Sequence, residues 1–127
     1  MSDIRTVQTQ QAPAPKGHYS QGIVHGGLVY VAGQLPLDPA TGEPTGGDAA
    51  AQAERTLRNV EAVLEAAGSS LSRLLSVTVY VTDIALWGEV NRAYSTVLGN
   101  HRPARAIVPV QELRAGCLIE IQAIAAV

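Results

Sequence analysis

Two charged side chains, Arg105 and Glu120, lie in short and otherwise apolar segments of the last quarter of the chain, residues 103–106 and 119–125. Removing an isolated charge from water is costly, so a charge inside a strand normally has a partner or a ligand. A guanidinium can bind a carboxylate through two parallel hydrogen bonds, and a carboxylate can move a proton or hold a water. The two residues are therefore either an ion pair that fixes strand register or assembly, or a binding and catalytic pair.

The segments that carry these charges are expected to be strands, over residues 105–110 and 117–125, and to be antiparallel neighbours. Counting in steps of two, Arg105 shares a face with Ile107 and Pro109, and Glu120 shares one with Leu118 and Gln122. If the strands pair through the connection between them, both charges could face one cleft. The spacing fixes neither the register nor the choice between the structural and the functional role.

Further strands are expected near the N-terminus. Residues 19–25 and 28–32 are two short runs on either side of Gly26 and Gly27, which predicts a hairpin. Gly33 is expected to end the second of these strands. An extended first strand is expected near residues 4–9, before the hairpin.

Two amphipathic helices are predicted on either side of a strand over residues 75–81. Asp48 is expected to cap the first helix and Gly68 to end it, whereas Asp83 caps and Gly99 ends the second. The apolar stripes, all expected to be core, are Ala53, Leu57, Val60, Leu64 and Ala67 in the first helix, and Trp87, Val90, Tyr94, Val97 and Leu98 in the second.

These elements predict a single α+β domain over residues 1–127, with a mixed sheet, the order β-β-α-β-α-β-β and both helices packed on one face. The last strand nevertheless carries apolar residues on both sides, with Leu118 and Ile124 beside Glu120 and Gln122 on the second side. Such a face is not expected to remain in water. We therefore expect a homo-oligomer in which other subunits cover it.

Composition narrows the class of function. The net charge is −2 without a basic block, so a nucleic-acid surface is not expected, and no apolar run approaches the roughly 20 residues needed to span a membrane. Neither a metal site nor a disulfide is expected, because the three histidines lack metal-ligand spacing and Cys117 is the only cysteine. The N-terminus has no apolar signal-peptide region, and a cytoplasmic location is the default.

Nine short motifs together carry a family resemblance. They are residues 17–22 (GHYSQG), 31–36 (VAGQLP), 41–43 (TGE), 52–60, 64–68 (LEAAG), 79–83 (VYVTD), 90–94 (VN and Tyr94), 103–105 (PAR) and 119–121 (IEI). In this order and spacing the chain resembles the Rid (YjgF) family of enamine and imine deaminases over nearly its whole length. The resemblance implies a chorismate-mutase-like fold of the bacillus type, and a homotrimer with active sites between subunits.

The resemblance also implies a reaction. Members like the archetype, the 2-iminobutanoate/2-iminopropanoate deaminases, hydrolyse reactive 2-aminoacrylate-type enamines through their imines to 2-keto acids and ammonia, without metal or cofactor. Arg105 corresponds to the arginine that binds the substrate carboxylate, and Glu120 to the acid that activates water. The remaining implied contacts are Tyr19, which closes the pocket, Asn91, which lines it, and backbone groups of Gly33 and Ile107.

Two positions depart from the pattern of some members. Ala32 and Ile107 stand where a serine and a cysteine occur, so the pocket is expected to be drier and its substrate preference shifted. The alternatives are a non-catalytic binding or chaperone-like protein that recognises a small 2-keto acid, and a pathway-specific imine hydrolase with an aminomuconate-like or biosynthetic substrate. Retention of both Arg105 and Glu120 favours an enzyme, because sensing a carboxylate needs only the arginine.

Overall fold

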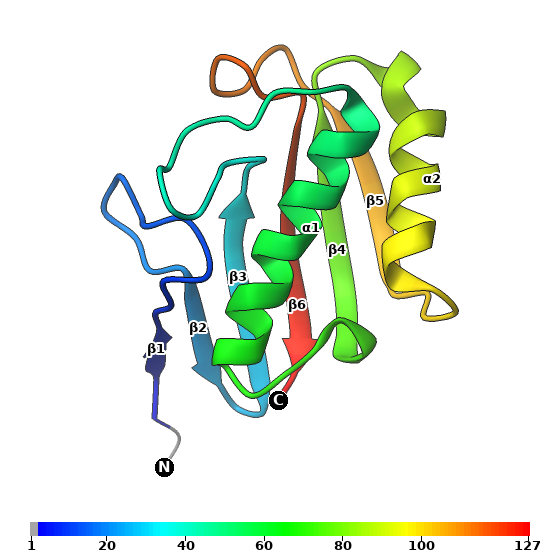
Figure 1. The fold of residues 1–127 in the computed structure, drawn as a ribbon. Helices are drawn as coiled ribbons and strands as arrows, with labels where there is room; N and C mark the ends of the chain where they lie inside the picture. The colour runs from blue at the N-terminus through cyan, green and yellow to red at the C-terminus, as the bar shows by residue number, and fades with distance from the viewer. Residues whose placement is uncertain (1–2) are drawn as a thin grey trace.

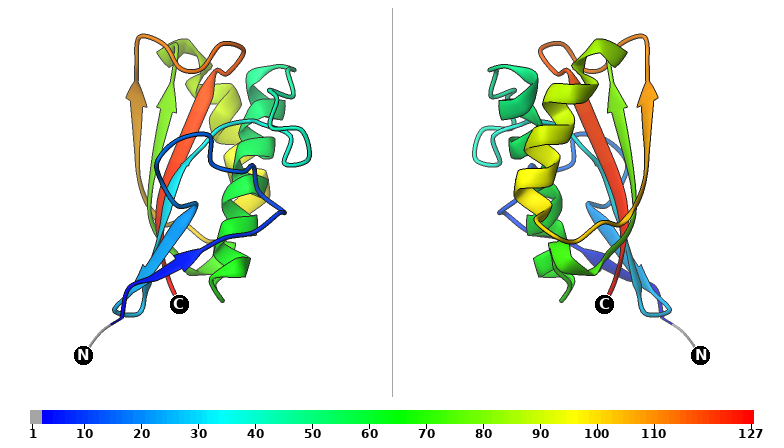
Figure 2. Two further views of the ribbon diagram at one scale, coloured as in Figure 1. Left: turned by 90° about the vertical axis from the view of Figure 1, so that its left-hand side faces the viewer. Right: turned by 90° about the vertical axis from the view of Figure 1, so that its right-hand side faces the viewer.

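The computed structural model describes residues 3–127, which form a mixed six-stranded sheet with two helices on one face (Figures 1 and 2). The elements are β1 Arg5–Val7, β2 Gly22–His25, β3 Leu28–Gln34, α1 Ala49–Ala66, η1 Leu71–Arg73, β4 Leu74–Val81, η2 Ile84–Leu86, α2 Trp87–Leu98, β5 Ala104–Pro109 and β6 Ile119–Ala126, where η marks a single 3₁₀ turn. The strand order is β1-β2-β3-β6-β4-β5. The predicted α+β class and helix placement are confirmed, and β1 is the additional N-terminal strand.

The hairpin of β2 and β3 forms at the predicted glycines. Gly26 and Gly27 have φ angles of 61° and 80°, a pair of positive values that a type I′ turn requires and that glycine adopts without strain. The prediction that Gly33 ends the strand is wrong, because β3 continues to Gln34. Its pairing with β6 shifts register between Val31 and Gln34, so Gly33 lies in an irregular stretch of the strand.

Both helices begin and end near the predicted residues. The Asp48 side chain accepts a hydrogen bond of 2.9 Å from the Ala51 backbone N–H at the start of α1, and Gly68, with φ of 85°, follows its end. The prediction that Asp83 caps the second helix is wrong: Asp83 accepts a bond from the Ala85 N–H and caps η2, the short turn that precedes α2, whereas the N-cap position of α2 is Leu86, which makes no side-chain cap bond. The stripe of α1 is buried against the sheet, as predicted: Ala53, Leu57, Val60, Leu64 and Ala67.

The last two strands are not neighbours, contrary to the prediction. β5 pairs in parallel with β4, whereas β6 lies between β3 and β4 and is antiparallel to both. Parallel pairing requires a crossover, and α2 supplies it. The connection over residues 110–118 is longer than a hairpin turn and carries the chain past one end of β4 (Figure 1).

The two faces of the sheet have different environments. Alternate residues of β6 are buried toward the helices: Ile119, Ile121, Ala123 and Ala125. The opposite face is free of helices in both side views of Figure 2. This open face mixes polar groups with Ile124 and with Tyr30, which is 42% exposed. As predicted, the helices cover one face of the sheet, and the other face carries both apolar and polar residues that nothing within residues 3–127 of the single chain covers.

Candidate active site

Arg105 lies on β5 opposite Val77, so its side chain is on the face that the helices cover. Its Nη1 donates a hydrogen bond of 2.9 Å to Oδ1 of Asn91 on α2. Its Cζ lies 4.7 Å from the ring centroid of Trp87 and 4.6 Å from that of Tyr94. Among residues 3–127, no carboxylate forms an ion pair with this guanidinium. An amide oxygen and two aromatic faces thus hold the cation, and its charge is not neutralised.

A cavity of about 500 Å³ opens beside this guanidinium. Its lining is Asn91, Tyr94, Ser95, Leu98, Gly99, His101, Arg102, Pro103 and Arg105. The lining contains two arginines and no acidic side chain, so the cavity favours an anionic ligand. A carboxylate could use the guanidinium N–H groups that Asn91 leaves free.

Glu120 lies on β6 opposite Tyr80, on the open face of the sheet. Its carboxyl group is packed against Gly33 so closely that a Cβ atom at Gly33 would overlap Oε2. Burial raises the pKa of Glu120 above its ordinary value. The carboxyl group forms neither a hydrogen bond nor an ion pair within residues 3–127. It is therefore an unpartnered acid whose pKa is displaced toward the range useful for proton transfer near neutrality.

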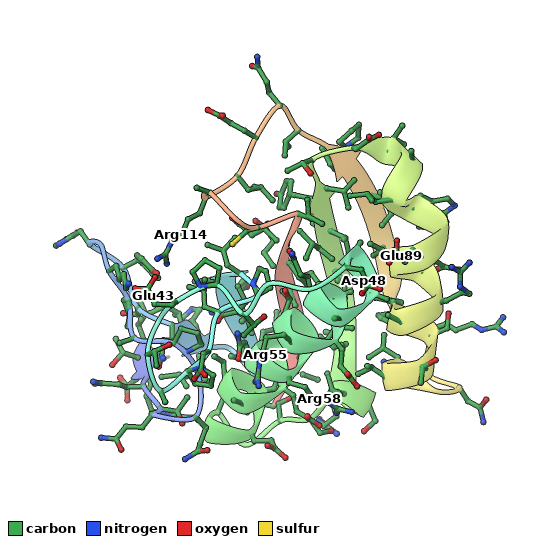
Figure 3. The ribbon with its side chains drawn as sticks, turned by 45° about the horizontal axis from the view of Figure 1, so that its top comes forward. Glu43, Asp48, Arg55, Arg58, Glu89 and Arg114 are labelled. Atoms are coloured by element: carbon green, nitrogen blue, oxygen red, sulfur yellow. The ribbon has the colours of Figure 1, made fainter. Side chains whose placement is uncertain are left out.

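Gly33 and Tyr19 line a second, smaller cavity of about 210 Å³. Its lining is Pro13, Ala14, Lys16, Tyr19, Gly33, Gln34, Leu35, Leu37 and Arg114. One wall is fixed by Arg114, which approaches Glu43 to 3.5 Å. Both side chains are labelled in Figure 3. Arg114 also donates a hydrogen bond to the Gly42 carbonyl. These contacts join two loops around the cavity and give Glu43 a structural role.

The structure divides the candidate residues into two groups. Arg105 and Asn91 form one group, and Ile107 lies on the same face of β5, opposite Val79. Tyr19, Gly33 and Glu120 form the other group.

Arg105 and Glu120 do not face one cleft of a single chain, nor do they form an ion pair within it. Their partners on β4, Val77 and Tyr80, are three residues apart, and an odd step along a strand reverses the face.

Trp87 is the site residue that the sequence reasoning missed. It was expected in the core, but it is 38% exposed and its indole packs on Arg105. Tyr94 is buried as predicted and also contacts the guanidinium. The available signal was the spacing of Trp87, Asn91 and Tyr94, which places a polar amide between two aromatic rings on one helix face.

No group of three or more His, Cys, Asp or Glu side chains within residues 3–127 is arranged to hold a metal ion. No helix in the same range is both long enough and apolar enough to cross a membrane.

The six-stranded sheet with two helices on one face, and the two groups of candidate residues, place the chain in a class of small α+β proteins. Its sequence and its fold are similar to those of known proteins over nearly the whole chain. The family described as Endoribonuclease L-PSP matches residues 9–127. A RutC family protein of Pyrococcus abyssi is 45% identical over 117 residues, which cover 92% of each chain. A 2-iminobutanoate/2-iminopropanoate deaminase of Escherichia coli (strain K12) is 40% identical over 124 residues, covering 95% of this chain and 96% of that protein.

Solved structures agree with the sequence comparison. The crystal structure of RidA from an Antarctic Psychrobacter superposes with a TM-score of 0.92 at 40% identity, and covers 97% of this chain and 99% of that one. The chain therefore belongs to the Rid (YjgF) family, the same family as the Endoribonuclease L-PSP description, and the resemblance expected from its motifs is confirmed.

Proposed function

We propose that the protein hydrolyses 2-aminoacrylate-type enamines, through their 2-imino acids, to 2-keto acids and ammonia. The observation that carries this proposal is an arginine, Arg105, that lies at an anion-favouring cavity and has no carboxylate partner among residues 3–127. The deaminase names of relatives near 40% identity support it. We propose that the protein acts in the cytoplasm, where it would remove reactive intermediates that pyridoxal-phosphate enzymes release.

Arg105 would anchor the substrate through its carboxylate. Asn91 uses one of the five guanidinium N–H donors, so a carboxylate can accept two of the others in a bidentate arrangement. A hydrogen bond to a charged group contributes about 1.5–3 kcal/mol. The larger effect is orientation, because an anchored carboxylate fixes the adjacent imine carbon relative to the attacking water.

Glu120 would move the protons. Acting on the protonated imine, the ionised carboxylate takes a proton from water while the water oxygen adds to the carbon, and the C=N electron pair moves to nitrogen to give a neutral carbinolamine. The protonated carboxyl then donates to the amine nitrogen. It recovers a proton from the hydroxyl as the C=O bond forms and ammonia departs, and ammonia carries the last proton away as ammonium. General acid–base assistance of this kind is worth about 10²–10⁴-fold, and the raised pKa of Glu120 suits both directions of transfer.

These roles require two subunits. Arg105 and Glu120 lie on opposite faces of one sheet, so an arginine can meet a glutamate only across an interface between copies of the chain. The open sheet face and the edge strand β5 provide surface for such contacts. We propose the homotrimer that the family resemblance implies, with Arg105 and Asn91 from one subunit and Tyr19, Gly33 and Glu120 from the next.

The first test is 2-keto acid formation from 2-iminobutanoate generated in situ by an amino-acid oxidase. Arg105→Ala should lose the acceleration while its oligomer mass is unchanged. Arg58→Ala is the matched control, because Arg58 lies on the exposed face of α1, where it pairs with Glu61 at 3.0 Å, and the variant should remain active. Wild-type turnover by Arg105→Ala would refute the proposal.

The second test asks whether the site is shared between subunits. Arg105→Ala and Glu120→Gln proteins, each inactive alone, are mixed in equal amounts through a reversible dissociation step. In a closed ring with head-to-tail interfaces, about a quarter of the interfaces then combine an intact arginine with an intact glutamate, and about that fraction of wild-type activity should return. No recovery in verified mixed oligomers would refute a site formed by two chains.

One observation favours a second candidate, a 2-keto acid binding protein. Residues of one chain line the Arg105 cavity, and Glu120 is not among them. Calorimetry with 2-oxobutanoate, combined with the turnover assay, separates the two functions. Binding that needs Arg105 without acceleration of any imine would favour the sensor.

A further inference from the structure

Trp87 is an aromatic residue that neither the core nor the proposed reaction accounts for. It begins α2, remains 38% exposed, and places its ring centroid 4.7 Å from Cζ of Arg105. A tryptophan at such a distance attracts a guanidinium through the negative face of its ring. The contact therefore acts on the one side chain that the proposed function makes the carboxylate anchor, and the inference rests on that assignment.

Arg105 depends on such contacts because little else fixes it. A long arginine side chain has several rotatable bonds, and its only side-chain hydrogen bond within residues 3–127 is the one that Nη1 donates to Asn91. A single bond at one nitrogen leaves the plane of the guanidinium free to turn. Two aromatic faces remove that freedom, since a guanidinium stacks with its plane against a ring.

The two rings are held differently by the fold. Tyr94 is only 7% exposed, and its hydroxyl has no hydrogen-bond partner among the described residues, so its ring is fixed by packing within the core. Burial raises the pKa of Tyr94, against the influence of the Arg105 charge, so the ring stays neutral. Trp87 lies at the solvent side, and among the described contacts of Arg105 it is the one that can be changed with least effect on the core.

We propose that Trp87 is a positioning residue for the substrate carboxylate, which it serves by holding the guanidinium of Arg105 against Asn91 with the remaining N–H groups available to an anion. Trp87 itself transfers no proton. Its loss should weaken carboxylate binding and raise KM, whereas kcat should change little once substrate is bound, because Glu120 carries the proton transfer.

The test compares Trp87→Phe with Trp87→Leu. Both remove the bulk of the indole, but only phenylalanine retains an aromatic face. A cation–π contact of this kind corresponds to about tenfold in affinity, so Trp87→Leu should raise KM for 2-iminobutanoate and the Kd for 2-oxobutanoate about tenfold. Trp87→Phe should remain within about threefold of wild type. Ile84→Ala is the control for removing an exposed apolar side chain near α2. Ile84 is 55% exposed and is not among the residues that line the Arg105 cavity.

A fluorescence titration keeps the inference testable even if Trp87→Leu does not fold or assemble. Trp87 is the only tryptophan of the chain, so its emission reports its contact with Arg105. Saturation with butanoate, which does not absorb in this range, should change the emission of the wild type but not that of Arg105→Ala. Unchanged wild-type emission, with calorimetry showing butanoate bound, would overturn the inference.

The outcomes separate this inference from the proposed function. Equal KM and Kd values for Trp87→Leu and Trp87→Phe would refute the positioning role even if the protein is a deaminase. If no imine is hydrolysed but Trp87→Leu binds 2-oxobutanoate about tenfold more weakly than Trp87→Phe, the deaminase proposal fails and the positioning role stands.

Discussion

Gly33→Ala should disable turnover while leaving the fold intact. Gly33 is not among the glycines with positive φ, so alanine can adopt its backbone conformation. The new Cβ would overlap Oε2 of Glu120 and would lie 3.0 Å from its Cδ, and its three nearest atoms all belong to Glu120. The obstructed group is the end of a flexible side chain on the open face, which can move aside. The substitution is therefore expected to act first on the carboxyl group of Glu120.

The expected magnitudes differ between stability and activity. Replacing glycine by alanine at a compatible position stabilises a protein by about 0.4–1 kcal/mol through the unfolded chain. Moving Glu120 to another rotamer offsets part of this, so the free energy of unfolding should change by less than about 1 kcal/mol. Turnover should fall by about 10²-fold, because a displaced general base loses most of an effect worth about 10²–10⁴.

The assay is kcat/KM for 2-iminobutanoate as a function of pH, with urea unfolding measured alongside. In the wild type, activity should fall as the pH drops through the raised pKa of Glu120, because the base must be ionised. In Gly33→Ala the carboxyl is more solvated, so the acid limb of the residual activity should move to lower pH. Wild-type kcat/KM with an unmoved acid limb would refute the argued role of the contact between Gly33 and Glu120.

Three further predictions concern stability. Glu120→Gln should raise the free energy of unfolding relative to wild type, most at pH 8 and least at pH 4. A raised pKa in the folded state means that the folded chain binds the proton more tightly than the unfolded chain does, so the cost of burying the ionised carboxyl appears as the pH rises. Equal differences in urea unfolding at the two pH values would contradict this. Gln21→Leu should lower the free energy of unfolding by about 3 kcal/mol, because this buried amide bonds to both backbone groups of Thr9 and to the carbonyls of Ala12 and Pro13. A decrease below about 1 kcal/mol in chemical denaturation would show that these bonds contribute little. Asp48→Ala should cost about 1 kcal/mol by removing the cap of α1, whereas Asp48→Asn should retain most of it, and equal losses in thermal melts would argue against the cap.

Local features of the fold could be predicted because local chemistry determines them. Two adjacent glycines specify the β2–β3 turn, and the aspartates at 48 and 83 specify where helical turns begin. The place of β6 could not be predicted in the same way. Alternation identifies a strand but not its neighbour, and the true partners of β6 lie far from it in the sequence.

The candidate site shows the same limit. Residue types identified Arg105 and Glu120, but their relative faces depend on which positions of β4 they oppose, a property of long-range register. Trp87 was misplaced in the core because the helical stripe continues to it. α2 covers the edge strand β5, so the stripe there meets the guanidinium instead of further sheet.

The central position of β6 has a consequence for how the chain folds as it is synthesised. β3 and β4 flank this strand but do not pair with each other, so each has an unpaired edge until residues 119–126 leave the ribosome. A nascent chain that already contains both helices therefore still exposes the edges of β3 and β4, whose unpaired backbone groups can bond to another chain. We expect completion of the sheet to be a late and slow event, since it joins β3 to a strand about three quarters of the chain length away. The residue proposed to transfer protons, Glu120, enters with the strand that closes the sheet.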